Sequence, residues 1–288
     1  MNRTYRLLAL LAFAALCPLA FGQAQKKEYD DAYREGARLV NAKKFAESQA
    51  PLERALLAAA NDDQRKQVYQ ALVQGEGAYR LLPDVDKFLE AKEFIIRHTD
   101  RKAGRSIDAR VIADFLFQRG KLDVAIQRYE AALKADPKDP AALGVLTVIY
   151  SRLKEDKAKA AALTAQQDAL NVELAMALAT RLEKDAGAAP QTAASLLKDA
   201  GSAWLEAGDK AKALAAAKKS LAQPPEQRTG ILTMQWREGL GDVLLAAGDP
   251  ALAVQQFEAA VAAANAGPLR ERAEKKLAEA KAAAEKKP

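Results

Sequence analysis

Apolar residues recur every three or four positions through much of this 288-residue chain, which is the spacing of one face of an α-helix. Alanine supplies much of the apolar content and has the best helix propensity. Residues that favour strands are scarce and dispersed. The pattern therefore predicts an all-α protein, with amphipathic helices that include Gln64–Leu81, Val85–Arg97 and Val172–Asp185.

The first 22 residues have the organisation of an export signal. Arg3 and Arg6 precede the apolar run Leu7–Leu16, and Ala20 and Gly22 are small residues placed for cleavage after Gly22, with cleavage after Ala24 as the alternative. The run is shorter than the roughly 20 residues that span a membrane. We therefore expect residues 1–22 to be a signal peptide and the mature protein to be periplasmic or secreted.

Two alternatives keep the chain at a membrane. One is an uncleaved N-terminal anchor, and the other is lipidation of Cys17, the only cysteine. Lipoprotein signals place a small residue before the lipidated cysteine, whereas this chain has Leu16 there. Cleavage is therefore favoured, and membrane contact is expected only through an N-terminal signal that is not removed.

Residues 106–139 contain a spaced set of small, aromatic and proline residues. Counted from Ser106, positions 15, 20, 24, 27 and 32 hold Gly120, Ala125, Tyr129, Ala132 and Pro137. This window resembles the tetratricopeptide repeat, a helix–turn–helix unit of about 34 residues. In that family small residues occupy positions 8, 20 and 27, a bulky aromatic residue position 24, and proline position 32.

The same 34-residue frame starts again at Tyr29, Ala194 and Met234. The resemblance implies an all-α, right-handed superhelical solenoid of antiparallel helix pairs, because one unit cannot bury its apolar face alone. The expected segments are a signal peptide (1–22), repeats (29–62, 106–139, 194–227 and 234–267), a degenerate helical pair (63–105), a degenerate repeat plus an extra helix (140–193), and a charged capping helix and tail (268–288).

The frames also predict particular packing contacts. Gly201 and Gly241, at position 8, should let the second helix approach closely at Ala213 and Ala253. The glycines at position 15 should end the first helix of each pair, since glycine accepts the left-handed backbone common there. Pro140 suits the first turn of a helix, where an amide donor is not needed.

The sequence offers little for catalysis. His98, the only histidine, follows Ile96 and Arg97 near a predicted helix end, where contact with the last carbonyl groups is its simplest role. No phosphate-binding glycine loop, catalytic triad or metal-ligand set is present. Trp204 and Trp236 are expected in the core. We therefore expect no enzyme activity, no metal and no cofactor.

Charge argues against nucleic acid as a partner. The 44 basic and 38 acidic residues are interspersed, whereas nucleic-acid-binding proteins gather basic residues into a patch. A protein partner is expected instead.

In proteins with this repeat, first helices line a concave groove through positions 2, 5, 9, 12 and 13. The resemblance thus implies a groove formed by Tyr33, Asn41, Arg110, Asp114, Phe117, Gln118, Arg152, Lys198, Glu206, Gln235, Glu238 and Asp242. Chaperone-docking members hold a terminal carboxylate with lysine and asparagine at positions 5 and 9. The corresponding pairs here do not match: Tyr33/Ala37, Arg110/Asp114, Lys198/Ser202 and Glu238/Asp242.

Overall fold

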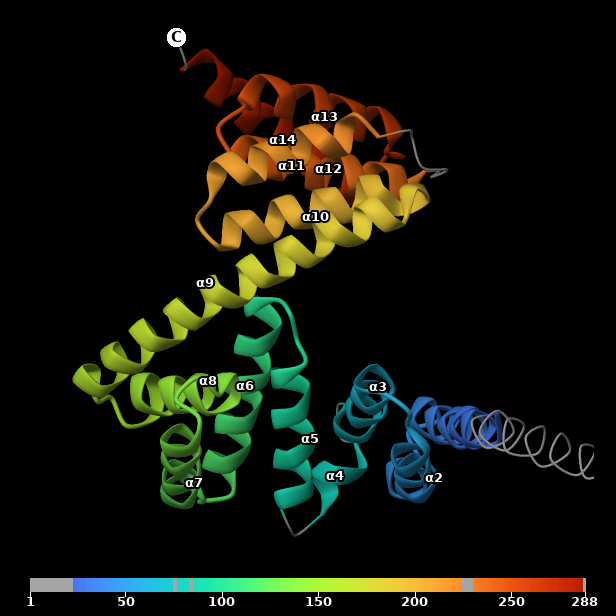
Figure 1. Ribbon diagram of the computed structural model, residues 1–288, viewed down its shortest axis with the longest axis vertical. Coiled ribbons are helices and arrows are strands. Elements are labelled where there is room, and N and C mark those ends of the chain that lie inside the picture. Colours follow the sequence, from blue (N-terminus) through green and yellow to red (C-terminus); the bar gives the residue numbers. More distant parts are fainter. Residues whose placement is uncertain (1–22, 75–76, 83–84, 224–229, 287–288) are drawn as a thin grey trace, which may run out of the picture. The chain divides into compact units, whose positions relative to one another are not determined.

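The structure is a computed structural model that describes residues 23–74, 77–82, 85–223 and 230–286. Within these residues the chain is all-helical, with helices that pack in adjacent pairs and no strand (Figure 1). The all-α prediction is confirmed for this part of the chain. The expected signal peptide lies outside the described residues. None of the described helices is both long and apolar enough to cross a membrane.

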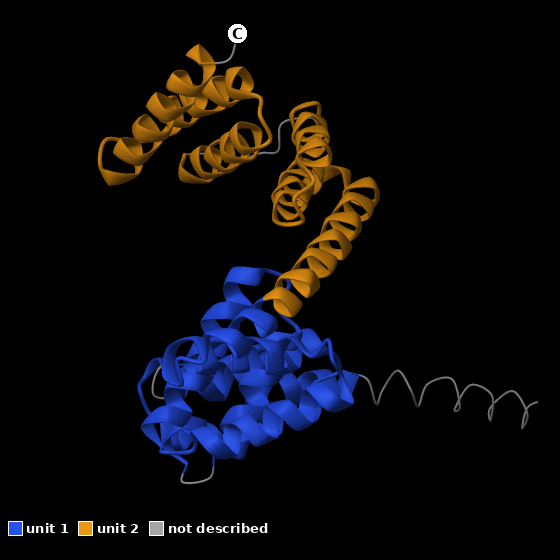
Figure 2. Ribbon diagram, turned by 90° about the vertical axis from the view of Figure 1, so that its left-hand side faces the viewer, with its two compact units in different colours: residues 1–164 blue, residues 165–288 orange. Residues whose placement is uncertain are grey.

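The chain forms two compact units, residues 1–164 and 165–288, coloured separately in Figure 2. Unit 1 begins with a helix over residues 23–41. It continues with α2 (Phe45–Ala58), α3 (Asp62–Val73), α4 (Ala78–Leu81), α5 (Asp86–Arg97), α6 (Lys102–Gln118), α7 (Leu122–Ala135), α8 (Pro140–Val148) and a π-helix, η1 (Ile149–Leu153). The long helix α9 (Lys157–Ala188) starts in unit 1 and ends in unit 2.

Unit 2 continues with a short 3₁₀ turn, η2 (Pro190–Thr192), and five further helices: α10 (Ala193–Glu206), α11 (Lys210–Leu221), α12 (Ile231–Ala246), α13 (Pro250–Ala263) and α14 (Pro268–Glu285). Its main core combines small alanines with Trp204, Leu244 and Phe257. Small side chains allow the helices to approach closely, and the larger ones fill the space between successive pairs.

The turn at position 15 of the four repeat frames has the same left-handed backbone conformation. Position 15 of the frames holds Lys43, Gly120, Gly208 and Gly248, with φ of 59°, 64°, 82° and 94°. Glu155, with φ of 54°, is the equivalent residue of the degenerate unit that starts at Pro140. The glycine helix ends were predicted. Lys43 and Glu155 adopt the same left-handed backbone conformation, so this turn occurs in five units of the chain.

The π-helix explains why Glu155 comes one residue late. The segment 155–160 matches 208–213 only after a one-residue insertion. Residues Ile149–Leu153 form a π-helix, in which each turn holds one more residue than in an α-helix. The extra residue is thereby absorbed inside the helix, and the following turn keeps its shape.

The close helix crossings occur at the predicted glycines. A Cβ on Gly201 would lie 2.9 Å from Cγ1 of Val243 and 3.3 Å from the backbone oxygen of Ala213, the predicted partner. A Cβ on Gly241 would lie 2.7 Å from the ring of Phe257, so the residue facing this glycine is the aromatic at position 24 and not Ala253. Position 8 thus makes room for neighbouring side chains as well as for backbone.

Two predicted helix boundaries are wrong. The expected helix Gln64–Leu81 is divided into α3 and the one-turn α4. A Cβ on Gly77 would lie 2.5 Å from the carbonyl oxygen of Leu72, so the chain folds back on itself where only glycine fits. The expected helix Val172–Asp185 is part of α9, whose alanine-rich sequence contains no residue that interrupts it.

Buried ionic groups join α5, α7 and the start of α8 in unit 1. Arg128 contacts both carboxylate oxygens of Glu93, at 3.1 and 3.3 Å. Arg97 contacts both oxygens of Asp139, at 3.3 and 2.8 Å, while Asp139 also accepts from the backbone amide of Ala141. Because Glu93 and Asp139 are buried, each needs its arginine, and the pairs fix how these helices pack.

Candidate protein-binding surface

One face of α6 presents large apolar side chains to solvent. Ala109, Ile112 and Leu116 are buried on the side that packs into unit 1. Ile107 and Phe117, 64% and 56% exposed, lie on the opposite side with Arg110 and Asp114. These four residues are three, four and three positions apart, which places them on a single face of the helix. We call them the α6 face.

The charged residues of the α6 face have no ionic partner in the described part of the chain. Arg110 is exposed and Asp114 half-buried. The neighbouring Asp108, by contrast, pairs with Lys92 at 2.6 Å. The α6 face therefore offers an unpaired cation, an unpaired anion and two apolar side chains. Gln118, the last residue of the helix, is exposed beside Phe117.

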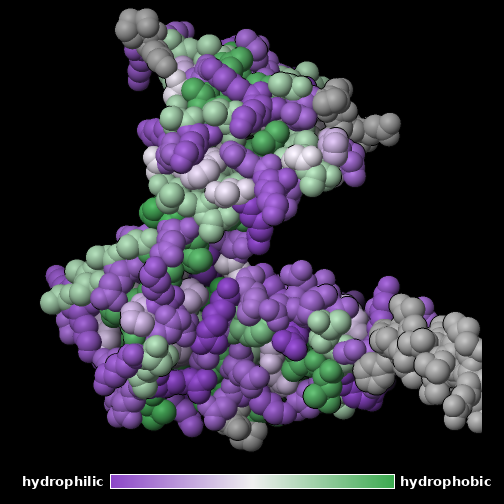
Figure 3. Space-filling model, in the orientation of Figure 1, coloured by the Kyte–Doolittle hydropathy of each residue, from purple (hydrophilic) through white to green (hydrophobic). Residues whose placement is uncertain are grey.

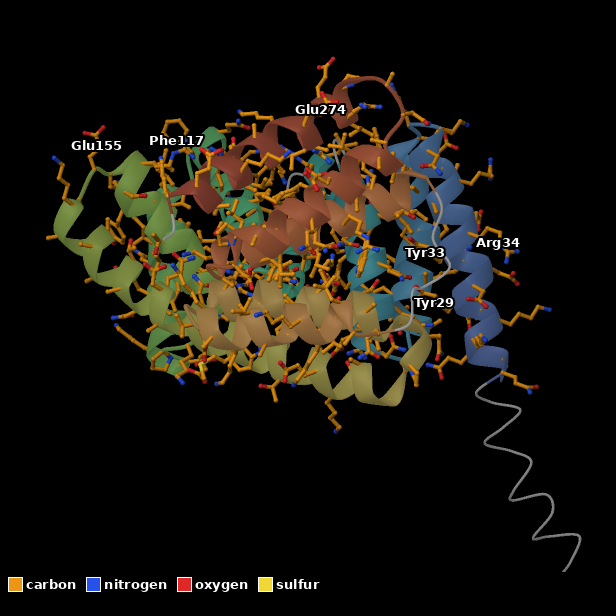
Figure 4. All side chains as sticks on the ribbon, turned by 90° about the horizontal axis from the view of Figure 1, so that it is seen from above. Tyr29, Tyr33, Arg34, Phe117, Glu155 and Glu274 are labelled. Atoms are coloured by element: carbon orange, nitrogen blue, oxygen red, sulfur yellow. The ribbon has the colours of Figure 1, made fainter. Side chains whose placement is uncertain are left out.

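Figure 3 shows hydrophilic and hydrophobic side chains interspersed on the face that it presents. Phe117 points outward from its helix in Figure 4. Single exposed apolar residues are common in soluble proteins, so it is the combination with unpaired charges on one face that distinguishes α6.

The other expected groove residues of unit 1 have different surroundings. Tyr33 stacks on Tyr29, with ring centroids 5.8 Å apart and nearly parallel planes (Figure 4). Tyr29 is buried and donates a hydrogen bond to Gln67 at 3.1 Å; its burial, and then Tyr33, raise its pKa. Asn41 is exposed at the end of the first helix, and Arg152 is exposed in the π-helix. Nothing among the described contacts joins these residues to the α6 face.

In unit 2, residues of α14 form ion pairs with two of the expected groove residues, of which Glu238 is buried and Asp242 stays exposed. Glu238 contacts Arg272 at 2.6 Å and Lys276 at 3.0 Å, and Asp242 contacts Lys276 at 2.6 Å. Glu238 is 4% exposed, so its expected exposure in a groove is not observed. Burial alone would raise the pKa of Glu238, but the two cations outweigh it and lower the pKa.

The sequence held a signal for these ion pairs. Arg272 and Lys276 follow Glu238 and Asp242 by 34 residues each, which is one repeat period. Opposite charges at equivalent positions of successive first helices therefore indicate a contact between those helices. The ion pairs become predictable only when residues 34 positions apart are compared with each other.

The remaining expected groove residues of unit 2 lie on α10 and α12. Lys198 is half-buried and pairs with Asp199 at 2.8 Å. Glu206 and Gln235 are exposed. Unit 2 therefore presents fewer unpaired charges at these positions than the α6 face does.

The predicted positions of Trp204, Trp236 and His98 agree with the structure. Trp204 is 5% exposed, and its indole nitrogen donates to Glu183 at 3.0 Å. Trp236 is partly buried against the same core. His98 ends α5, with Nδ1 2.9 Å from the Phe94 carbonyl oxygen.

No protein-family model matches the chain. No curated protein matches it either. Among the described residues, no three His, Cys, Asp or Glu side chains are grouped so that they could hold a metal ion.

Proposed function

We propose that this protein is a non-catalytic scaffold that binds a peptide or helix of another protein through the α6 face. The observation that carries the proposal is the exposure of Ile107 and Phe117 beside the unpaired Arg110 and Asp114. Protein interfaces are enriched in aromatic residues and arginine near their centres. Phe117 and Arg110 are therefore the best candidates for the residues that contribute most to binding.

The repeated turn supports a tetratricopeptide-type solenoid as the scaffold. Five left-handed turns occur at equivalent places, and three glycines at position 8, Gly36, Gly201 and Gly241, lie at close crossings. A right-handed superhelix built from such pairs would place α6 among the first helices that line its concave side. Arrays of this kind present extended surfaces to other proteins.

Catalysis is the less favoured class. His98 is held at a helix end, and Glu93 and Asp139 are engaged by arginines. General acid–base chemistry needs positioned groups that can exchange protons with a substrate. We therefore propose that the protein acts through binding, without a cofactor and without nucleic acid.

The N-terminal sequence supports a location in the periplasm or outside the cell. Two arginines, an apolar run and small residues precede the first described helix. The alternative is a membrane-tethered envelope assembly factor, held by an uncleaved or lipidated N-terminus. The mass of the purified protein distinguishes them: a start near Gln23 or Gln25 removes the anchor, whereas an intact or lipid-modified Cys17 retains it.

The α6 face can be tested with a matched control. The mature protein and an Arg110→Ala/Asp114→Ala/Phe117→Ala variant are used as bait in a pull-down from the native cell envelope. Val124→Ala is the control, since Val124 is 65% exposed but lies on α7. The proposal expects a partner retained by the wild type and the control and lost from the folded triple variant. Equal capture by all three would refute binding through this face.

A further inference from the structure

Unit 2 contains a cleft away from all the groove positions named above. It lies between the end of α9, the start of α10 and the end of α11, and its volume is about 390 Å³. This is within the range of roughly 300–1,000 Å³ typical of sites for small molecules, near its lower end. A compact ligand would fit such a cleft best.

The cleft combines an apolar floor with one acid and one base. Ala186, Ala193 and Leu197 are buried together and form the floor. Glu183 and Lys219 line the same cleft from α9 and α11. Opposite charges beside an apolar floor suit a ligand that carries both charges and an aliphatic body.

Both charged groups are available to a ligand. Glu183 Oε1 accepts from the Trp204 indole nitrogen at 3.0 Å, which orients the carboxylate, and Oε2 has no hydrogen bond from the described residues. Lys219 makes no ion pair with the described part of unit 2. A charged group left without a protein partner at a cleft can form a charge-assisted hydrogen bond with a ligand.

Gly187 lines the cleft and has open space where a side chain would stand. It lies in the last turn of α9, and its φ is not among the left-handed values. A Cβ built on it would meet no atom within 4 Å, so neither packing nor backbone conformation requires glycine there. Glycine is less favourable than alanine within a helix. Because Gly187 lines the cleft, we expect a bulky side chain at position 187 to occupy part of its volume.

We propose that this cleft binds a small zwitterion with an aliphatic body, of the size of a dipeptide. The ligand's ammonium group is held by Glu183, its carboxylate by Lys219, and its side chains pack on Ala186, Ala193 and Leu197. The site is independent of the α6 face, so either can fail without the other.

The first test uses the dipeptide Leu-Leu and two analogues that each lack one charge. N-acetyl-Leu-Leu has no ammonium group, and Leu-leucinamide has no carboxylate. Isothermal titration calorimetry measures affinity, and the indole N–H signal of Trp204 reports binding beside Glu183. Leu-Leu should bind saturably and shift that signal, and each analogue should bind about tenfold more weakly. The absence of heat and of a shift up to about 10 mM would overturn the proposal.

Variants then test the roles of Lys219, of Glu183 and of the open space beside Gly187. Lys219→Met should abolish the difference between Leu-Leu and Leu-leucinamide, and Glu183→Gln the difference between Leu-Leu and its acetylated form. Gly187→Leu should block binding while the thermal midpoint stays equal or rises, because leucine favours the helix. The exposed neighbour Ala188 gives the control, Ala188→Leu, which should bind as the wild type does. Unchanged binding by Gly187→Leu, or equal affinity of wild type for all three ligands, would contradict the site.

Discussion

Replacing Glu155 by glycine should stabilise unit 1. Glu155 has φ of 54°, a conformation in which an L-residue is disfavoured by roughly 1–2 kcal/mol. Glycine removes that cost but loses more conformational freedom on folding, by about 0.5–1 kcal/mol. The midpoints of these two ranges give an expected net gain of about 0.5–1 kcal/mol for Glu155→Gly.

Glu155→Ala is the matched control, since alanine removes the side chain but keeps the Cβ. The Glu155 side chain is exposed and makes no hydrogen bond or ion pair with the described residues, so Glu155→Ala should leave stability unchanged.

Hydrogen exchange of amides in α8 and the π-helix measures the local effect. A gain of about 0.5–1 kcal/mol raises protection roughly two- to fivefold in Glu155→Gly. Equal protection in the glycine and alanine variants would refute the assignment of Glu155 to the turn position held by glycine in other units. The reciprocal change, Gly248→Ala, should lower protection in unit 2.

Three further predictions concern other helices of the two units. The pKa of Glu238 is lowered in the folded protein, so its contribution to stability is present above about pH 4.3, the ordinary glutamate value, and is lost as the pH falls through the lower pKa of the folded state. Acid titration of unit 2 should show this loss of stability, and the Glu238→Gln variant should lack this pH dependence. Gly241→Ala should cost about 1–3 kcal/mol in urea unfolding, since its Cβ would lie 2.7 Å from Phe257, whereas Gly239→Ala, with a contact of 3.4 Å, should not destabilise. Lys121 begins α7 without a side-chain cap, so Lys121→Asp should raise the thermal midpoint by supplying about 1 kcal/mol of capping.

Helix-forming residues and turn glycines made much of the fold predictable. Gly120, Gly208 and Gly248 mark helix ends because their conformation excludes most other residues. Lys43 and Glu155 adopt the same conformation without that signature, so tertiary packing decides the backbone there. The break at Gly77 also depends on a backbone approach that no periodicity reveals.

The candidate surface was predictable only in part. The repeat frame places Arg110, Asp114 and Phe117 on one helix face, and the structure has them there. Whether a groove position stays exposed depends on the next helix, and for Glu238 that helix brings Arg272. The exposure of a groove side chain depends on the helix packed beside it, which the sequence of one 34-residue window does not reveal.

Site-specific photo-crosslinking in the native cell is the most direct test of binding through the α6 face. A photoreactive phenylalanine analogue is placed at position 107 or 117, and at position 124 on α7 as the control; all three positions are exposed. The proposed function predicts a discrete covalent adduct with one partner protein from positions 107 and 117, and none from 124. Adducts from 124 alone, or no adduct at 107 and 117 in folded protein, would contradict it.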